Sequence, residues 1–158
     1  MMPFDESFMR EALLQAKQAV EQGEVPIGCV VVQDGAIIAR AHNLRETWQD
    51  PTAHAEILAL REAARKLGRW RLTGATLYAT MEPCAMCAGA LVLARVDRLV
   101  YGCPDPKAGA CGSVFDIVRE PQLNHRIEVG IGVLEEECQS VLKEFFADRR
   151  GENQAFEQ

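Results

Sequence analysis

The sequence lacks three features that would each define a whole class of protein. Its 158 residues contain no run of about 18 apolar residues, so no segment is predicted to span a membrane. Cations are not in excess: 17 Lys and Arg against 23 Asp and Glu give a formal net charge of −6, which argues against a protein that coats nucleic acid by charge alone. The first 22 residues carry four acidic side chains within their apolar stretch, so we expect no secretory signal there.

The composition is that of a globular chain. Apolar residues make up 48% and charged residues 25%, a balance that excludes a disordered, collagen-like or rod-like coiled-coil protein. The length predicts a single domain over residues 1–158 with a sizeable core. Six cysteines without a leader are expected to be thiols or metal ligands, not disulfides, and we expect a cytoplasmic location.

Hydrophobic periodicity predicts strands that alternate with helices. Asp34-Gly35 between two short apolar runs indicates a β-hairpin. We expect helices over residues 5–22, 52–67, 83–94, 114–119 and 135–150, and strands over 27–32, 36–41, 75–80, 98–101 and 126–130. This order predicts a layered α/β domain with helices on both faces of one sheet, followed by a flexible tail at 151–158.

Two short motifs contain the residues most suited to chemistry, His54-Ala55-Glu56 and Pro83-Cys84-Ala85-Met86-Cys87. Cys84 and Cys87, three residues apart at the start of a helix, share one helix face and can bind one metal ion. His54 can supply a third ligand, and one imidazole with two thiolates favours zinc.

The spacing of His54 and Glu56 restricts where the metal can lie. In mid-helix, side chains two residues apart point in nearly opposite directions. His54 and Glu56 therefore converge on one ion only if that ion lies off the helix N-terminus. Three protein ligands leave a tetrahedral zinc ion with one position open for water, as in catalytic sites. Glu56 is then predicted to accept a proton from that water.

An isolated Cys-x-x-Cys motif would also fit a redox pair or half of a structural zinc site. A closed structural site in a non-enzymatic module would need a fourth ligand, which would have to be one of Cys29, Cys103, Cys111 and Cys138. Otherwise these four residues are expected to be buried thiols. Both motifs together, with Pro83 before the first cysteine, match the zinc nucleobase deaminases.

From about Phe4 to Arg150 the sequence resembles the bacterial tRNA-specific adenosine deaminases of the cytidine-deaminase-like superfamily. The resemblance rests on Asn43 and on segments 24–28, 50–56, 80–90, 105–110, 112–113 and 124–126. The Asp-Pro-Lys-Ala-Gly-Ala loop at 105–110 and the Asn-His-Arg segment at 124–126 favour the tRNA enzymes within that superfamily.

The resemblance implies a three-layer fold with a mixed five-stranded sheet and one zinc ion per chain. It implies hydrolytic conversion of adenosine to inosine at wobble position 34 of a tRNA anticodon, by a zinc-activated water with Glu56 moving the protons. It also implies an anticodon stem-loop as partner and a homodimer. A small-molecule deaminase acting on guanine or cytosine remains open, because its zinc ligands and glutamate would look the same.

The resemblance assigns substrate binding to Asn43, Ala55, Pro83, Asp105, Lys107 and Phe146. Taken alone, Asn43 and Asp105 are more typical of turn positions than of binding sites, and Phe145 and Phe146 are typical of a helix face in the core, although one of them can face the RNA. Cations near segments that the family uses for the anticodon arm are Lys107, Arg126, Lys143, Arg149 and Arg150. They predict RNA binding through a few phosphate contacts and a modest dependence on salt.

Overall fold

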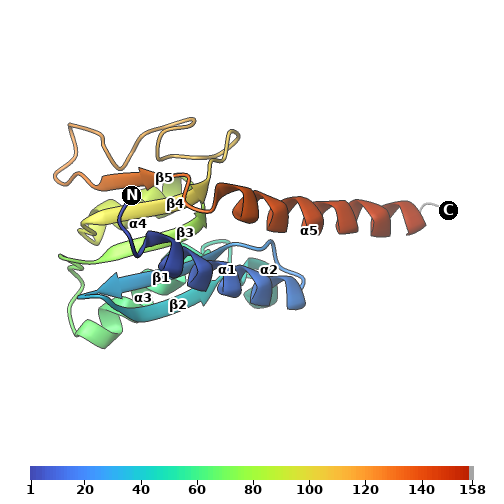
Figure 1. Ribbon diagram of the computed structural model, residues 1–158, viewed down its shortest axis with the longest axis horizontal. Coiled ribbons are helices and arrows are strands. Elements are labelled where there is room, and N and C mark those ends of the chain that lie inside the picture. Colours follow the sequence, from blue (N-terminus) through green and yellow to red (C-terminus); the bar gives the residue numbers. More distant parts are fainter. Residues whose placement is uncertain (157–158) are drawn as a thin grey trace.

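The structure is a computed structural model that describes residues 1–156. It contains five helices and five strands over this range (Figure 1). In chain order they are α1 (Asp5–Glu21), β1 (Gly28–Gln33), β2 (Ala36–His42), α2 (Arg45–Trp48), α3 (Ala55–Leu67), β3 (Thr76–Met81), α4 (Ala85–Leu93), β4 (Arg98–Cys103), β5 (Glu128–Ile131) and α5 (Glu135–Phe156).

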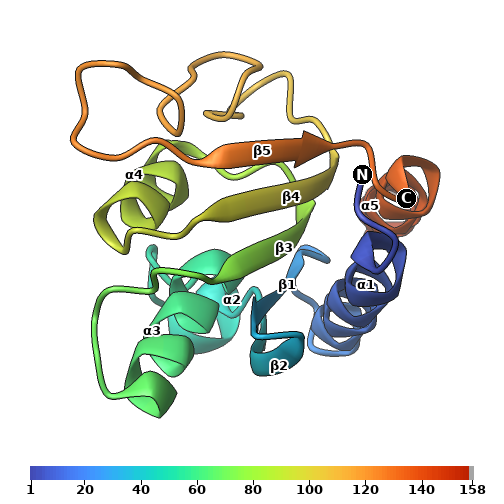
Figure 2. The same cartoon turned by 60° about the vertical axis from the view of Figure 1, so that its left-hand side comes forward.

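The five strands form one mixed sheet in the order β2-β1-β3-β4-β5. Strand β1 pairs antiparallel with both β2 and β3, whereas β3, β4 and β5 run parallel to one another. Helices α1 and α5 cover one face of the sheet and α3 and α4 the other (Figure 2). The predicted three-layer arrangement with a mixed five-stranded sheet is therefore confirmed.

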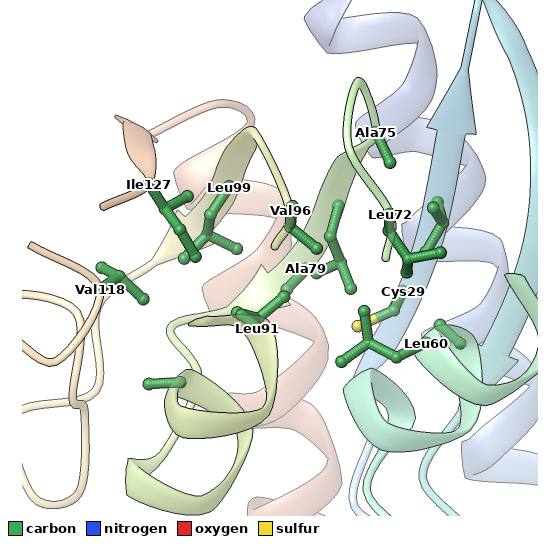
Figure 3. Close-up of a cluster of buried hydrophobic side chains, with 14 of the residues drawn as sticks. Cys29, Leu60, Leu72, Ala75, Ala79, Leu91, Val96, Leu99, Val118 and Ile127 are labelled. Atoms are coloured by element: carbon green, nitrogen blue, oxygen red, sulfur yellow. The ribbon is translucent and has the colours of Figure 1, made fainter. Parts of the chain in front are cut away.

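Alternation along the strands creates two cores, one on each face. On β1, Cys29 and Val31 face α3 and α4, whereas Val30 and Val32 face α1 and α5. The larger core joins Leu77 and Leu99 of the sheet to Leu91 of α4 and Leu60 of α3, as Figure 3 shows for several of these side chains. Because successive side chains point to opposite faces of a strand, both sides of the sheet are buried.

The predicted hairpin is confirmed between β1 and β2. Asp34 and Gly35 have φ of 51° and 77°, the left-handed backbone that a tight two-residue hairpin turn requires. Strand β2 then ends at His42, so Asn43 lies directly after the carboxyl end of this strand.

The predicted helix at 114–119 is wrong. The segment is irregular, with turns and an isolated bridge between Cys111 and Asp116. The backbone N–H groups of Val114 and Ile117 donate to the carbonyls of Gly109 and Ala110 rather than to those four residues back. Bonds to the preceding loop therefore replace the helical ones.

Several boundaries also differ from the expectation. The polar stretch after β2 contains a one-turn helix, α2, that the sequence pattern did not predict; the Glu24 carboxylate stabilises it by accepting hydrogen bonds from the N–H groups of Glu46 and Thr47. Helix α3 begins at Ala55 instead of residue 52, because Thr52 bonds to the Asp50 side chain in a turn.

The last helix is longer than expected. Helix α5 continues to Phe156 instead of ending near residue 150, and residues 157–158 lie outside the described range. The flexibility expected of residues 151–158 stays a prediction. Within the described residues, no helix combines the length and the apolar character needed to cross a bilayer.

Candidate metal centre and active site

The site forms where two helices begin at the same edge of the sheet. His54 is the N-cap of α3 and Cys84 the N-cap of α4, and both have extended backbone angles (ψ of 149° and 179°). Their carbonyls accept the first helical hydrogen bonds, from Leu58 and Ala88. Strand β3 leads directly into Cys84, so the carboxyl end of a parallel strand positions the thiol. As the residue spacing required, the cluster lies off helix N-termini.

The three predicted ligands converge. His54 Nδ1 lies 3.6 Å from Cys84 Sγ and 3.5 Å from Cys87 Sγ, and all three ligand atoms lie within 4.8 Å of one another. A nitrogen at about 2.05 Å and a sulfur at about 2.3 Å from a tetrahedral zinc ion would be separated by about 3.6 Å. The donor set and its spacing therefore fit zinc.

The cluster has three ligands and not four. Within the described residues, no other His, Cys, Asp or Glu has a ligand atom that close to all three. The remaining cysteines, Cys29, Cys103, Cys111 and Cys138, are free and buried, as expected. A closed structural zinc site would need one of them as a fourth ligand, and the observed cluster does not include it.

Electrostatics within the cluster favours the metal-binding form at Cys84, whereas the shared hydrogen bonds raise the pKa of both His54 and Cys87 and so favour their protonated forms. A hydrogen bond with Cys87 and a second with His54 lower the pKa of Cys84 to about 3. Cys84 in turn raises the pKa of His54. The thiolate that results at Cys84 is the form of cysteine that binds metals.

Glu56 lies beside the cluster without belonging to it. Its side chain is 4% exposed, and its Oε1 atom has no hydrogen-bond partner among the described residues. Burial raises the pKa of the Glu56 carboxyl. An unpartnered buried carboxylate oxygen is costly unless a water or ligand completes its bonding, so this oxygen indicates a bound molecule at the site.

A cavity of about 90 Å³ opens onto this carboxylate, lined by Val25, Ile27, Asn43, Arg45, His54, Ala55 and Glu56. One water molecule needs only about 15 Å³, so the cavity has room for water beside the Glu56 carboxyl group. It brings two predicted substrate-binding residues, Asn43 and Ala55, next to His54 and Glu56. Pro83 is buried in the link between β3 and Cys84 and is not among the lining residues.

The Asn43 side chain is tied to the backbone around it. Its Nδ2 donates to the Val25 carbonyl at 3.3 Å, and its Oδ1 accepts from the N–H of Arg45 at 3.1 Å. Arg45 also lines the cavity and was missed by the sequence analysis. Nothing in the motifs marks this arginine, which reaches the cavity only because α2 follows Asn43 directly.

The other predicted RNA contacts form a separate group. Asp105 Oδ1 accepts hydrogen bonds from the N–H groups of Lys107 and Ala108, the turn that its residue type allowed. Lys107 and Phe146, far apart in sequence, line one cavity of about 370 Å³ together with Leu142, Lys143 and Arg150. Phe146 is 43% exposed there, whereas the neighbouring Phe145 is buried.

This layered fold, with one histidine, two cysteines and a buried glutamate at converging helix ends, is that of the zinc-dependent deaminases. The family model of the MafB19-like deaminases matches residues 4–150.

Individual relatives define the family more closely. The tRNA-specific adenosine deaminase of Bacillus subtilis is 56% identical over 151 residues, covering 96% of this chain and 94% of the relative. A structure from studies of A-to-I editing by tRNA:A34 deaminases is 47% identical and superposes with a TM-score of 0.83 over 86% of this chain and 99% of that one. The guanine deaminase of B. subtilis is more distant, 36% identical with a TM-score of 0.62 over 81% and 83% of the two chains. The chain belongs to the tRNA-specific adenosine deaminase family.

Proposed function

We propose that the protein converts adenosine to inosine at wobble position 34 of tRNA anticodons, with release of ammonia. The observation that supports this most directly is the open three-ligand cluster beside the unpartnered Glu56 carboxylate. The tRNA-specific adenosine deaminases among its relatives supply the substrate class.

His54, Cys84 and Cys87 would hold one zinc ion per chain. When bound, the zinc ion activates a water molecule for attack on a ring carbon that carries an amino group. The Glu56 carboxylate takes a proton from that water and passes it to the ring nitrogen N1 of adenine. A second proton from the same water leaves with the amino group as ammonia, so adenosine and water give inosine and ammonia and Glu56 returns to its starting state.

We expect the wall of the cavity to position the base. Ala55 presents a small, apolar surface in this wall, and the Asn43 amide contains both a donor and an acceptor suited to a purine edge. Pro83 is buried next to the ligand Cys84 and does not line the cavity, so a contact between Pro83 and the base is proposed from the family resemblance alone. Because this amide now bonds to Val25 and Arg45, recognition would use its remaining donor and lone pair or exchange one of those contacts. We also propose that Asp105, in the turn that leads to Lys107, contacts the sugar–phosphate chain.

The anticodon stem-loop is the proposed partner, with the Lys107–Phe146 cavity as the place of its flanking nucleotides. An exposed aromatic ring with three cations around it (Lys107, Lys143 and Arg150) offers stacking and phosphate contacts together. We expect the affinity for a stem-loop to fall with salt, with a slope that corresponds to a few phosphates. A slope indistinguishable from zero would contradict this binding mode.

We further propose that the chain works as a homodimer in the cytoplasm, where its tRNA substrate is. The face between α3 and α4 has a shallow apolar cavity of about 300 Å³, and Trp70 and Leu93 at its rim are 61% and 70% exposed. Exposed apolar residues gathered in one place are typical of subunit interfaces. Changing Leu93→Asp should convert a species of twice the 17.5 kDa chain mass into monomer in sedimentation equilibrium. Leu14→Asp, at a position on α1 that is also exposed (52%), should not.

The decisive experiment uses a synthetic anticodon stem-loop with adenosine at the wobble position. Wild-type protein should form inosine, and Glu56→Gln should lose about 10²–10⁴-fold in kcat while it retains zinc. Turnover of free guanine or cytosine with an inert stem-loop would instead establish a small-molecule deaminase. Failure of the wild-type protein to deaminate any of these substrates, with zinc bound, would support a structural zinc module.

A further inference from the structure

A second buried glutamate, Glu82, lies just before the Cys-x-x-Cys motif and has no part in the chemistry described above. Its side chain is 3% exposed. Oε1 accepts hydrogen bonds from the N–H of Asp105 at 3.0 Å and from the Ser113 hydroxyl, and Oε2 accepts from the N–H groups of Cys111 and Ser113 at 3.0 and 3.1 Å. Four donors from one irregular segment, residues 105–113, therefore converge on a single carboxylate.

Gly109, within the same segment, packs closely against the Glu82 carboxyl group. A Cβ atom built on Gly109 would overlap the Glu82 carboxyl group, so only glycine leaves room for the carboxylate at this position. The main chain adds two bonds, because the Glu82 N–H donates to the Cys103 carbonyl and the Ala110 N–H donates to the Pro83 carbonyl. The segment is thus joined to Pro83 as well as to Glu82, and Glu82 is itself bonded to Cys103 at the end of β4.

These contacts connect two functional regions that are distant in sequence. Glu82 precedes the ligand Cys84 by two residues, and the segment it binds begins with Asp105 and includes Lys107, both proposed to contact RNA. The segment contains no helix or strand of its own, only turns and an isolated bridge, so local structure does not fix its position. Four hydrogen bonds to the buried carboxylate, together with the Ala110–Pro83 backbone bond and the burial of Ala110 and Cys111, hold its backbone in place relative to the metal ligands.

We infer that Glu82 is a positioning residue. It holds segment 105–113 at a fixed position relative to the ligand cysteines, so that Asp105 and Lys107 contact the RNA while the reacting base lies at the metal site. The inference rests on the proposed function, since Asp105 and Lys107 matter only if RNA is the substrate. A displaced segment should weaken binding of the stem-loop more than the chemical step, because His54, Cys87 and Glu56 lie outside the segment.

The test compares Glu82→Gln with wild type in steady-state deamination of the anticodon stem-loop. In this variant the side-chain NH₂ group would face at least one of the backbone N–H donors, and that hydrogen bond would be lost. We expect KM to rise roughly tenfold or more, kcat to fall by a smaller factor, and bound zinc to stay at one per chain. Asp116→Asn is the matched control, because it removes an exposed carboxylate from the adjoining stretch and should leave KM unchanged.

Gly109→Ala perturbs the same contact without changing the carboxylate, and should raise KM similarly. The double variant should show less than the product of the two separate effects, because both disrupt one contact. If Glu82→Gln does not fold, Gly109→Ala and Ser113→Ala make the same test, with a smaller rise in KM expected for the loss of the Ser113 hydroxyl. KM values within twofold of wild type in the folded variants, or parallel loss of zinc, would overturn the inference. Inactivity of the wild-type protein on the stem-loop would instead count against the proposed function.

Discussion

A buried ion pair on the face of the sheet opposite the active site allows a quantitative prediction of stability. Asp5, at the start of α1, is fully buried and accepts hydrogen bonds from both terminal nitrogens of Arg98 at 2.8 and 2.7 Å and from the Tyr78 hydroxyl at 2.7 Å. It thereby joins α1 to β3 and β4. Burial alone would raise the pKa of Asp5, but these hydrogen bonds outweigh it and lower the pKa to about 2.

The expected pH dependence follows from this shift. A carboxyl whose pKa is lowered by folding stabilises the protein fully above its unfolded pKa of 3.8, and loses that contribution as the pH falls toward 2. Each pKa unit corresponds to about 1.4 kcal/mol, so the contribution is about 2 kcal/mol. In Asp5→Asn, Arg98 keeps a buried charge without a charged partner, which costs about 3 kcal/mol at neutral pH.

The assay is urea unfolding of zinc-loaded wild type and Asp5→Asn between pH 7 and pH 3. Any effect of zinc loss that is common to both proteins cancels in the difference between their free energies of unfolding. This difference in free energy of unfolding should be about 3 kcal/mol at pH 7 and should become smaller as the pH approaches 3. Glu6→Gln, in the same helical turn but exposed, should change stability by less than about 0.5 kcal/mol. A difference below 1 kcal/mol at pH 7, or one that does not narrow in acid, would refute this account of the ion pair.

Two further predictions concern packing and the metal. Gly28→Ala should destabilise the protein by about 1–3 kcal/mol, because the added methyl group would overlap the α1 backbone at Ala12, whereas Gly151→Ala, with open space around it, should be neutral or slightly stabilising in thermal unfolding. Cys84→Ser should abolish zinc binding and deamination, whereas Cys138→Ser should retain zinc by metal analysis; equal zinc content in both would contradict the assigned ligand set.

Much of the site was predictable because its chemistry depends on short, local spacings. His54 with Glu56 and Cys84 with Cys87 are each two or three residues apart, and the geometry of a helix N-terminus then limits where their side chains can meet. The structure places the three ligand atoms together and Glu56 beside them, in agreement with that prediction. The strand and helix order was predictable for the same reason, since each element has its own hydrophobic period.

What was missed depends on contacts that lie outside the local pattern of each element. The apolar residues at 114–119 suggested a helix, but hydrogen bonds to Gly109 and Ala110 hold the segment in turns. Helix α2 is too short to be stable alone and is stabilised by Glu24, more than 20 residues earlier. Arg45 reaches the cavity only through that helix.

The sequence by itself was enough to predict the candidate metal donors, the proposed proton carrier and the layered class of fold, because these depend on residue type and on local hydrophobic period. Only the tertiary structure showed that Lys107 and Phe146, 39 residues apart in the chain, line one cavity, that α5 continues to Phe156, and that Glu82 binds the segment 105–113. Such pairings depend on how the chain returns to itself, and no local pattern of residues encodes that path.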